Sequence, residues 1–387
     1  MGHDRDQAPV GPTLHCPTLA FFPVAPTLHA LVIRPLDTTP RRLLVALSGG
    51  VDSATTAALL ASQGHELVTV FMRNGVVGSA AAKSCCSLSD ARDARAVADG
   101  LGVPFYVQDM SKGFHELIES FVSDYGRGLT PNPCVLCNND LKFGELLELA
   151  DDLGCDGVAT GHYARLENDR LFRAVDRLKD QSYLLHGLTA KQRSRALFPL
   201  GELTKDRVRL LAEEFGLKVA QKPDSADICF VPGGDYRAVV AERLGHLGQT
   251  GVLVDSSGKT LAEHPGVGAF TVGQRRGLGV ALGHPAYVTE IDAESGTVRV
   301  GPESDLARPS CQVGQLQCHE PLKDGAEVLV QMRHHHNPER ALCRLMGNQR
   351  IELLFEVPSR AVTPGQYAVC YQGDKVLAGG RIEKEQL

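Results

Sequence analysis

The stretch LLVALSGGVDSATTAALLASQ, residues 43–63, constrains the fold of this chain most strongly. Its apolar run predicts a buried strand, the string SGGVDS a glycine-rich turn, and the run after it a helix that starts near Ser53. Gly49 and Gly50 lack a Cβ, so backbone N–H groups in the turn can approach a bound oxyanion closely. The helix N-terminus directs its unpaired N–H groups and positive dipole end at the same place. The turn therefore predicts a site for nucleotide phosphates.

The other residues of the turn narrow the kind of site. Ser48 and Ser53 offer hydroxyl donors, whereas the Asp52 carboxylate would repel phosphate unless Mg²⁺ lay between them. The turn has neither the Walker lysine nor the Rossmann G-x-G-x-x-G spacing. The sequence thus predicts a phosphate site that belongs to neither class.

From residue 41 to about residue 226, strand patterns alternate with helical ones. Further strands are predicted at 66–72, 103–109 and 156–160, and further helices at 89–102, 112–125 and 204–217. We expect the Arg and Lys side chains of the last helix to be solvated. Such alternation is typical of α/β domains, in which helices cover a parallel sheet. Ligands bind at the carboxyl ends of the strands, where Asp52, Met72 and Gly161 would gather.

The second half of the chain has the pattern of β structure. One short helix is predicted at 237–248, and the segments VLVDSSGKTLAE and YVTEIDAESGTVRVG are typical of hairpins. Short β runs continue to Leu387 and predict a small barrel. We expect a flexible N-terminal extension (1–40), a nucleotide-binding catalytic domain (41–230), a central mixed domain (231–300) and a C-terminal β-barrel (301–387).

Composition indicates the environment of the protein. With 43% hydrophobic and 22% charged residues, and no apolar run of about 18 residues, the chain is expected to be globular and not to enter a membrane. The net charge of -6 argues against nucleic-acid binding through bulk charge, but is compatible with a local basic face. The cysteine count, 11, is odd, in a chain too large to need disulfides. This usage fits a reducing cytoplasm, and a monomer is the default expectation.

Two loops carry the most informative cysteines. In residues 128–150, Pro131 and Pro133 predict a loop that becomes helical near Asn139. Cys137 would then lie just before a helix N-terminus, a position that lowers the pKa of a thiol and favours the nucleophilic thiolate.

The pair Cys134 and Cys137 forms a C-x-x-C string, which is compatible with zinc, a redox disulfide or iron–sulfur ligands. No second pair follows at zinc-finger spacing. A third ligand would have to come from elsewhere, and Cys229, in the polar loop KPDSADICFVPGGDY, is the candidate.

Seven strings, in one order, carry a resemblance to a known family. They are SGGVDS, TPNPCVLCNNDLKF, ATGHYARL, KDQSYLL, PDSADICF, TVGQRRGLG and AVTPGQYAVCY. Over residues 41–387 the chain resembles the bacterial tRNA-specific 2-thiouridylases of the PP-loop ATP pyrophosphatase superfamily. The resemblance implies a parallel-sheet PP-loop domain of the adenine nucleotide alpha-hydrolase-like type, a small central domain and a C-terminal β-barrel.

The resemblance also implies an activity. Such an enzyme uses ATP and Mg²⁺ to adenylate O2 of the wobble uridine, U34, in the tRNAs for Lys, Glu and Gln. It then replaces that oxygen with sulfur from a cysteine persulfide, which an upstream donor protein loads. By the same resemblance Cys137 is the nucleophile and Cys229 carries the persulfide, so their loops must approach each other when tRNA binds.

Further residues are assigned by the same resemblance. The catalytic and ATP-binding set is Ala46, Leu47, Ser48, Gly49, Gly50, Val51, Asp52, Ser53, Met72 and Gly161. The pocket for the flipped base would be lined by Asn132, Pro133 and Cys134. The tRNA contacts would be His162, Lys179, Asp180, Gln181, Arg333, His334 and Gln366.

Several alternatives stay open on sequence alone. Some family members carry Asp, with a proton-transfer role, where this chain has Cys134, and a thiol of pKa about 8.5 is a poor substitute. Cys134, Cys137 and Cys229 could instead hold a [4Fe-4S] cluster with one open iron for sulfide. Two other hypotheses remain. The chain is another adenylating PP-loop enzyme, or it is a cysteine-rich protein that carries sulfur or metal without catalytic turnover.

Overall fold

The computed structural model describes residues 39–75, 87–224, 228–360 and 362–384. The predicted N-terminal extension, 1–40, lies outside these residues except at its last two positions. Within the described ranges, no helix has both the length and the apolar character needed to span a membrane.

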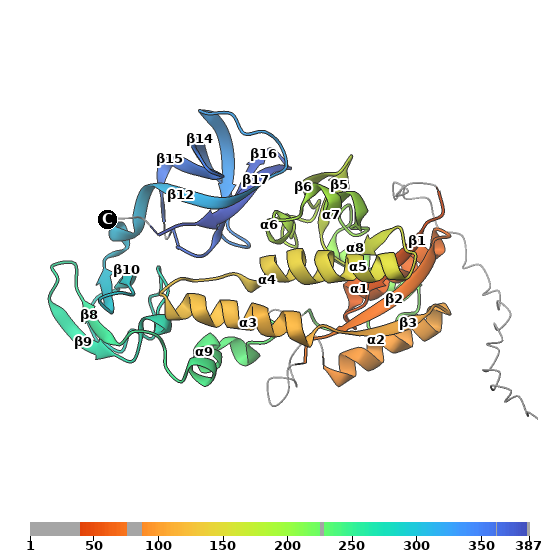
Figure 1. Cartoon of the computed structure of the whole chain (residues 1–387), viewed down its shortest axis with the longest axis horizontal. Coiled ribbons are helices and arrows are strands. Elements are labelled where there is room, and N and C mark those ends of the chain that lie inside the picture. The colour runs from red at the N-terminus through yellow and green to blue at the C-terminus, as the bar shows by residue number, and fades with distance from the viewer. Residues whose placement is uncertain (1–38, 76–86, 225–227, 361, 385–387) are drawn as a thin grey trace, which may run out of the picture. The chain divides into compact units, whose positions relative to one another are not determined.

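A five-stranded sheet with the order β3-β2-β1-β4-β7 forms the first part of the fold, and all its neighbours pair in parallel. Figure 1 shows three of these strands, β1, β2 and β3, side by side. The strands are β1 (Arg42–Ala46), β2 (Glu66–Arg73), β3 (Phe105–Asp109), β4 (Gly157–Ala159) and β7 (Ala196–Leu197). In β1, Leu44 packs into one hydrophobic cluster while Leu43 and Val45 pack into another. Because successive side chains of a strand point to opposite faces, both faces of the sheet are buried. The predicted α/β domain is confirmed.

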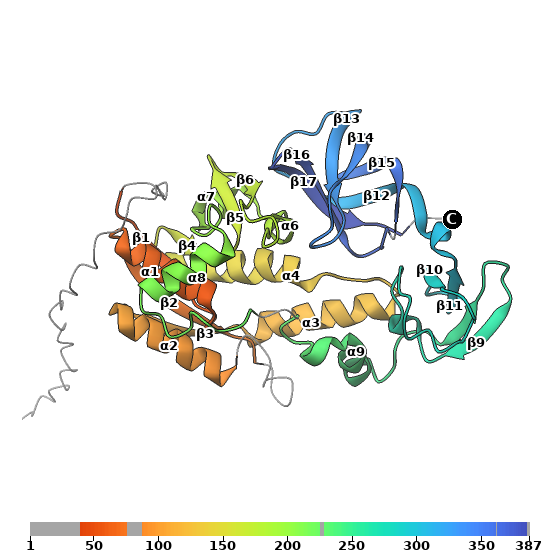
Figure 2. The ribbon, with the colours of Figure 1, turned by 180° about the vertical axis from the view of Figure 1, so that it is seen from behind.

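Helices cover the two faces of this sheet. Ala54, Ala57 and Leu60 of α1 (Val51–Ser62) share a cluster with Ala94 of α2 (Leu88–Leu101). The opposite cluster contains Phe114 of α3 (Ser111–Gly126) and Leu146 of α5 (Leu146–Asp152). The remaining α-helices of the described ranges are α4 (Pro133–Leu136), α6 (Ser182–Leu185), α7 (Ala190–Arg195), α8 (Lys205–Glu214) and α9 (Tyr236–Leu244). Helix α8 packs against α1 (Figure 2).

A second, four-stranded sheet follows, in the order β10-β11-β8-β9. It consists of β8 (Gly251–Val254), β9 (Thr260–His264), β10 (Tyr287–Asp292) and β11 (Thr297–Gly301). The pairs β8–β9 and β10–β11 are antiparallel, which confirms the two predicted hairpins, and β8 joins them by pairing in parallel with β11.

The C-terminal strands form a closed barrel. They are β12 (Ala307–Cys318), β13 (Ala326–Gln331), β14 (Glu339–Gly347), β15 (Arg350–Arg360), β16 (Tyr367–Gln372) and β17 (Lys375–Ile382). The order β12-β15-β14-β13-β16-β17 returns to β12 through the pairing of Val313 with Ile382. Closure leaves no unpaired edge in this ring. The predicted barrel is confirmed.

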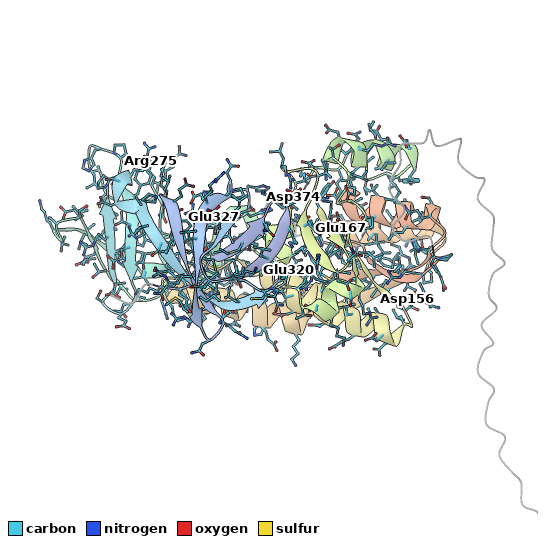
Figure 3. All side chains as sticks on the ribbon, turned by 90° about the horizontal axis from the view of Figure 1, so that it is seen from above. Asp156, Glu167, Arg275, Glu320, Glu327 and Asp374 are labelled. Atoms are coloured by element: carbon cyan, nitrogen blue, oxygen red, sulfur yellow. The ribbon has the colours of Figure 1, made fainter. Side chains whose placement is uncertain are left out.

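A hairpin of the first part attaches to the barrel. Strand β6 (Arg170–Arg173) pairs with β17 where Phe172 meets Lys375, and β5 (Ala164–Glu167) lies beyond it. Arg165 of β5 forms an ion pair with Asp374 at 3.1 Å, and Figure 3 labels Asp374 next to Glu167 at this junction. Sequence patterns alone placed the two segments in separate domains.

Two buried histidines near this junction make the stability sensitive to acid. The Nδ1 atom of His186 lies 2.7 Å from the carbonyl oxygen of Tyr183, and burial lowers its pKa to about 4. His319 Nε2 lies 2.6 Å from the carbonyl oxygen of His186, and burial lowers the pKa of His319 to about 3. Both rings are neutral in the folded protein, whereas histidines of the unfolded chain take up protons at higher pH. The contribution of the two rings to the free energy of unfolding is therefore complete above the pKa of an unfolded histidine and is lost as the pH falls below it.

We therefore expect the free energy of unfolding to fall by about 3 kcal/mol for His186 alone between pH 6.5 and pH 4. Urea unfolding across this range measures the effect. His186→Asn removes the titrating ring, so its pH dependence should be visibly shallower. Identical pH dependence of the two proteins would show that the histidine is not responsible.

Candidate active site

A cavity of about 400 Å³ opens at the carboxyl ends of β1, β2 and β4. Its wall contains every residue of the predicted ATP set except Gly49. Four of the predicted tRNA contacts line the same cavity, namely His162, Lys179, Gln181 and His334. Sequence reasoning missed other lining residues, which are Phe71, Asp90, Lys142, Thr160, Tyr163, Lys222, Pro223, Asp224 and His335.

The glycine turn is built by its own serines. The backbone N–H of Ser48 donates to Ser53 Oγ at 3.0 Å, and the two hydroxyls lie 3.1 Å apart. Helix α1 begins at Val51, two residues earlier than predicted, and its N-cap Gly50 provides no side-chain cap. The first N–H groups of the helix therefore lie at the cavity wall without a capping side chain, as a phosphate site requires.

Gly49 has a φ of +72°, and an added Cβ would lie 2.3 Å from the carbonyl oxygen of Asp90. We expect Gly49→Ala to distort the turn and weaken ATP binding at least about tenfold, since both the strain and the overlap act on the phosphate site. Calorimetric titration with ATP measures this change. Gly50→Ala is the matched control, because its Cβ would meet only Ser48 Oγ, at 3.4 Å. Equal ATP affinity of Gly49→Ala and the parent chain would contradict the prediction.

Asp52 is held by residues that are distant in sequence. Lys205 Nζ donates to both carboxylate oxygens of Asp52 at 2.8 Å, and Tyr163 Oη donates to one of them at 2.8 Å. Burial, followed by the charge of Asp52, raises the pKa of Tyr163 far above its ordinary value, so the phenol keeps its proton. Lys205 was expected to be solvated, but its side chain is only 10% exposed because it lies between Asp52 and Asp224. That expectation was wrong.

Asp224 continues this network on the other side of the cavity. Its carboxylate pairs with Lys205 at 2.8 Å, Lys179 at 2.7 Å and Arg209 at 2.9 Å. Partial burial acts to raise its pKa, but the hydrogen bonds from Lys179 and Lys205 outweigh it and hold the pKa below the ordinary value. Asp224 is therefore ionised at neutral pH.

Lys222 fastens the turn to α2. Its Nζ atom donates to the carbonyl oxygen of Gly49 at 2.9 Å and pairs with Asp90 at 2.7 Å and with Asp93. Burial acts to lower the pKa of Lys222, and the hydrogen bonds to the two carboxylates reverse this and raise it. The lysine is a fixed cation that neutralises carboxylates next to the phosphate turn.

The cysteine loop differs from its prediction. The helix begins at Pro133, because proline lacks an N–H that would in any case be unpaired in the first turn. Asn132 caps it by accepting from the N–H of Cys134 at 3.2 Å. Cys137 lies after this first helical turn, inside a continuous helical segment, so activation by a helix N-terminus does not apply to it.

The segment that starts at Cys137 is a π-helix, Cys137–Glu145. Helices of this kind are rare, and those that occur are often found at functional sites. Cys137 and Cys229 pack against the same two hydrophobic clusters, and Cys134 packs against one of these. The two distant cysteine loops therefore border a common core.

The remaining predicted tRNA residues occupy different environments. Asp180 is buried, and its carboxylate accepts from Arg173 Nε at 3.0 Å and from Ser182 Oγ at 3.0 Å. It holds the turn between Lys179 and Gln181 rather than facing the cavity. Arg333 Nη2 donates to Thr363 Oγ1 at 3.1 Å. Gln366 Nε2 donates to the carbonyl oxygen of Thr130 at 3.0 Å and so anchors the loop that leads to Asn132.

Three family models match the chain in succession. A model described as the tRNA methyl transferase HUP domain matches residues 41–233, the tRNA methyl transferase PRC-barrel domain matches 237–302, and the aminomethyltransferase beta-barrel domain matches 310–382. Among solved structures, a 4-thiouridine synthetase–RNA complex with bound ATP aligns with 53% of this chain and 50% of its own, at 15% identity and a TM-score of 0.33. That similarity is too low to support an argument.

Curated relatives match over nearly their whole length. The tRNA-specific 2-thiouridylase MnmA of Mycolicibacterium smegmatis is 47% identical over 362 residues, which cover 89% of this chain and 99% of that protein. MnmA of Carboxydothermus hydrogenoformans is 44% identical over 358 residues, covering 89% of this chain and 98% of that protein. The chain belongs to the tRNA-specific 2-thiouridylase family.

Proposed function

We propose that this protein converts U34 of the tRNAs for Lys, Glu and Gln to 2-thiouridine, by adenylation of O2 and transfer of sulfur from a persulfide on Cys229. As a member of its family it is an ATP-dependent tRNA uridine sulfurtransferase. The observation that carries the proposal is that one cavity is lined both by the phosphate turn and by three predicted tRNA contacts, Lys179, Gln181 and His334. A nucleotide and an RNA base can react only if one site admits both.

The first step activates the uridine. Carbonyl oxygen is a poor leaving group, so O2 attacks the α-phosphorus of ATP. The bond from that phosphorus to the β-phosphate oxygen breaks, its electron pair leaves with pyrophosphate, and the N3 proton goes to water. In the proposed complex the turn 48–53 and the N-terminus of α1 would face the phosphates, and Met72 and Gly161, which line the same cavity, would contact the adenosine.

Mg²⁺ would supply charge neutralisation on the phosphates when bound. Asp52 is the carboxylate of the turn that could hold it. Both of its oxygens accept hydrogen bonds from Lys205, so metal binding and this ion pair compete. If Asp52 exchanges Lys205 for Mg²⁺ when ATP binds, the metal enters the site together with the nucleotide.

The second step delivers sulfur. The terminal sulfur of the Cys229 persulfide attacks C2, and AMP leaves with the former O2. The Cys137 thiolate then attacks Sγ of Cys229, and the electron pair of the broken S–S bond stays on the sulfur attached to C2. Protonation at N3 gives 2-thiouridine, and Cys137 and Cys229 are left as a disulfide. A thiol reductant and a persulfide donor protein restore the enzyme for the next turnover.

A [4Fe-4S] cluster on Cys134, Cys137 and Cys229 is the alternative sulfur route. It would require these thiols to converge on one metal site. In residues 39–75, 87–224, 228–360 and 362–384, no three His, Cys, Asp or Glu side chains are arranged to hold a metal. We therefore propose the persulfide route, carried out by a monomeric enzyme in the cytoplasm.

Anaerobic reconstitution tests the function. The full chain is incubated with ATP, Mg²⁺, unmodified tRNA and a persulfide donor, and the tRNA is digested for nucleoside analysis. We expect 2-thiouridine together with one pyrophosphate per product. Absence of 2-thiouridine with every persulfide donor would refute the proposal and favour a sulfur-trafficking role. Iron and acid-labile sulfide, assayed in the active sample, distinguish the persulfide from the cluster.

A further inference from the structure

Lys142 is the cavity lysine that the phosphate turn and the resemblance leave without a role. It lies on the π-helix Cys137–Glu145 and lines the cavity that contains Ser48 and Asp52. In a π-helix the hydrogen bonds join residue i to residue i+5, so Lys142 lies about one turn beyond Cys137. The helix that carries the candidate nucleophile therefore also brings an ammonium group to the nucleotide cavity.

The other lysines around the cavity are neutralised by carboxylates. Lys179 pairs with Asp224 at 2.7 Å, Lys222 with Asp90 at 2.7 Å, and Lys205 with Asp52 and Asp224. Within the described ranges Lys142 forms no ion pair with a carboxylate. Its Nζ atom instead lies 3.5 Å from Nε2 of His162, at the outer limit of a hydrogen bond.

His162 is built to remain a neutral acceptor. It is 7% exposed, and its Nδ1 atom lies 2.6 Å from Thr160 Oγ1. The rings of Phe143 and Phe198 flank it, with centroids 6.2 Å and 6.0 Å from its own. If Nδ1 carries the proton toward Thr160, Nε2 presents a lone pair to Lys142. Burial, and then the charge of Lys142, keep the pKa of His162 well below its ordinary value.

We propose that Lys142 is the cation that binds the departing pyrophosphate during adenylation, and that His162 and Thr160 position it. This inference rests on the proposed function of the cavity. When the bond between the α-phosphorus and the bridging oxygen breaks, its electron pair passes to pyrophosphate, and an ammonium group not neutralised by a carboxylate stabilises that charge most effectively. A neutral imidazole can orient the lysine without cancelling its charge.

Two measurements test the role of Lys142. The first is binding of Mg²⁺-pyrophosphate to the full chain by calorimetry, for the parent and Lys142→Met, Lys142→Arg and Lys191→Met. Lys191 is exposed on α7 and provides the same substitution outside the cavity. We expect at least tenfold weaker binding for Lys142→Met, partial recovery for Lys142→Arg and no change for Lys191→Met. The second is single-turnover pyrophosphate release with ATP and unmodified tRNA, which should slow about 100-fold in Lys142→Met.

The outcomes separate this inference from the proposed function. If Lys142→Met binds and releases pyrophosphate like the parent, the role of Lys142 is refuted, whereas formation of 2-thiouridine by the parent still upholds the proposed function. If the parent makes no 2-thiouridine but its pyrophosphate binding depends on Lys142, the inference survives and the proposed function falls. Circular dichroism of each variant identifies misfolding, and Lys142→Arg then decides.

His162 needs a readout that a purely structural role would not move. His162→Gln keeps an acceptor for Lys142, whereas His162→Phe removes it. We expect His162→Gln to retain more of the pyrophosphate-release rate than His162→Phe, with a similar KM for ATP in both variants. Equal rates in the two variants, or a loss confined to KM, would refute the positioning role.

Discussion

Cys229→Ser should reduce 2-thiouridine formation at least about 1,000-fold while the enzyme still releases pyrophosphate from ATP in the presence of tRNA. Serine cannot carry a persulfide, but the phosphate turn and its lysines are untouched by the change. Nucleoside analysis and a pyrophosphate assay on the same reaction measure the two effects separately. Thiolation by Cys229→Ser at the parent rate would exclude this cysteine as the carrier.

Cys137→Ser should stop the reaction one step later than Cys229→Ser, after the sulfur has bonded to the uridine. Sulfur would reach C2 of the uridine, but no thiolate would then break the S–S bond to Cys229. We expect a covalent tRNA–protein adduct that survives denaturation and is released by dithiothreitol. Cys318→Ser, at an exposed position of the barrel, is the control and should retain full activity. Release of free 2-thiouridine tRNA by Cys137→Ser without added thiol would contradict the assigned roles.

Cys134→Ser discriminates the two sulfur routes. In the proposed persulfide route Cys134 would border the base pocket and carry no sulfur, so a partial loss of 2-thiouridine formation is expected. In the cluster route it is a ligand, and its loss would remove bound iron together with activity. A joint loss of iron and 2-thiouridine would favour the cluster.

Structural features that depend on neighbouring residues were predictable from the sequence. The run at 43–63 predicted a strand, a turn and a helix, since hydrophobic periodicity and paired glycines depend only on neighbouring residues. Met72 and Gly161 followed from the rule that parallel strands present their carboxyl ends at one edge, and both line the cavity with Asp52. The hairpins and the closed barrel followed from the same kind of reasoning.

The sequence did not show features that depend on the position within a helix or on tertiary contacts. Pro133 was read as a helix breaker, although proline suits the first helical turn, so the position of Cys137 was misjudged. The tRNA contact of Asp180 stays a prediction, but the pairing of its buried carboxylate with Arg173 was not predicted. Lys205 and Tyr163 are separated from Asp52 by 153 and 111 residues, and only the folded chain brings them together. A helical pattern cannot show which of its charges the tertiary structure buries.

Lys205→Met should have the largest effect on ATP binding of any single change outside the phosphate turn. Lys205 is the shared partner of Asp52 and Asp224, and its removal leaves two carboxylates without that cation beside a cavity that must accept a polyphosphate. We expect ATP affinity to fall about 100-fold and the free energy of unfolding to fall by about 1–3 kcal/mol, less than for a fully buried pair because both carboxylates are partly exposed.

Titration with ATP and urea unfolding measure these two effects of Lys205→Met, and Lys191→Met provides the same chemical change at an exposed site of α7. The double variant Lys205→Met with Asp52→Asn removes one of the repelling charges. Titrated with ATP in the absence of Mg²⁺, so that the metal role of Asp52 does not enter, it should recover part of the ATP affinity if repulsion is the cause, because the amide keeps the hydrogen bond with Tyr163. If the double variant binds ATP no better than Lys205→Met, then Lys205 acts on the phosphates directly, and its pairing with Asp52 is not what tunes the site.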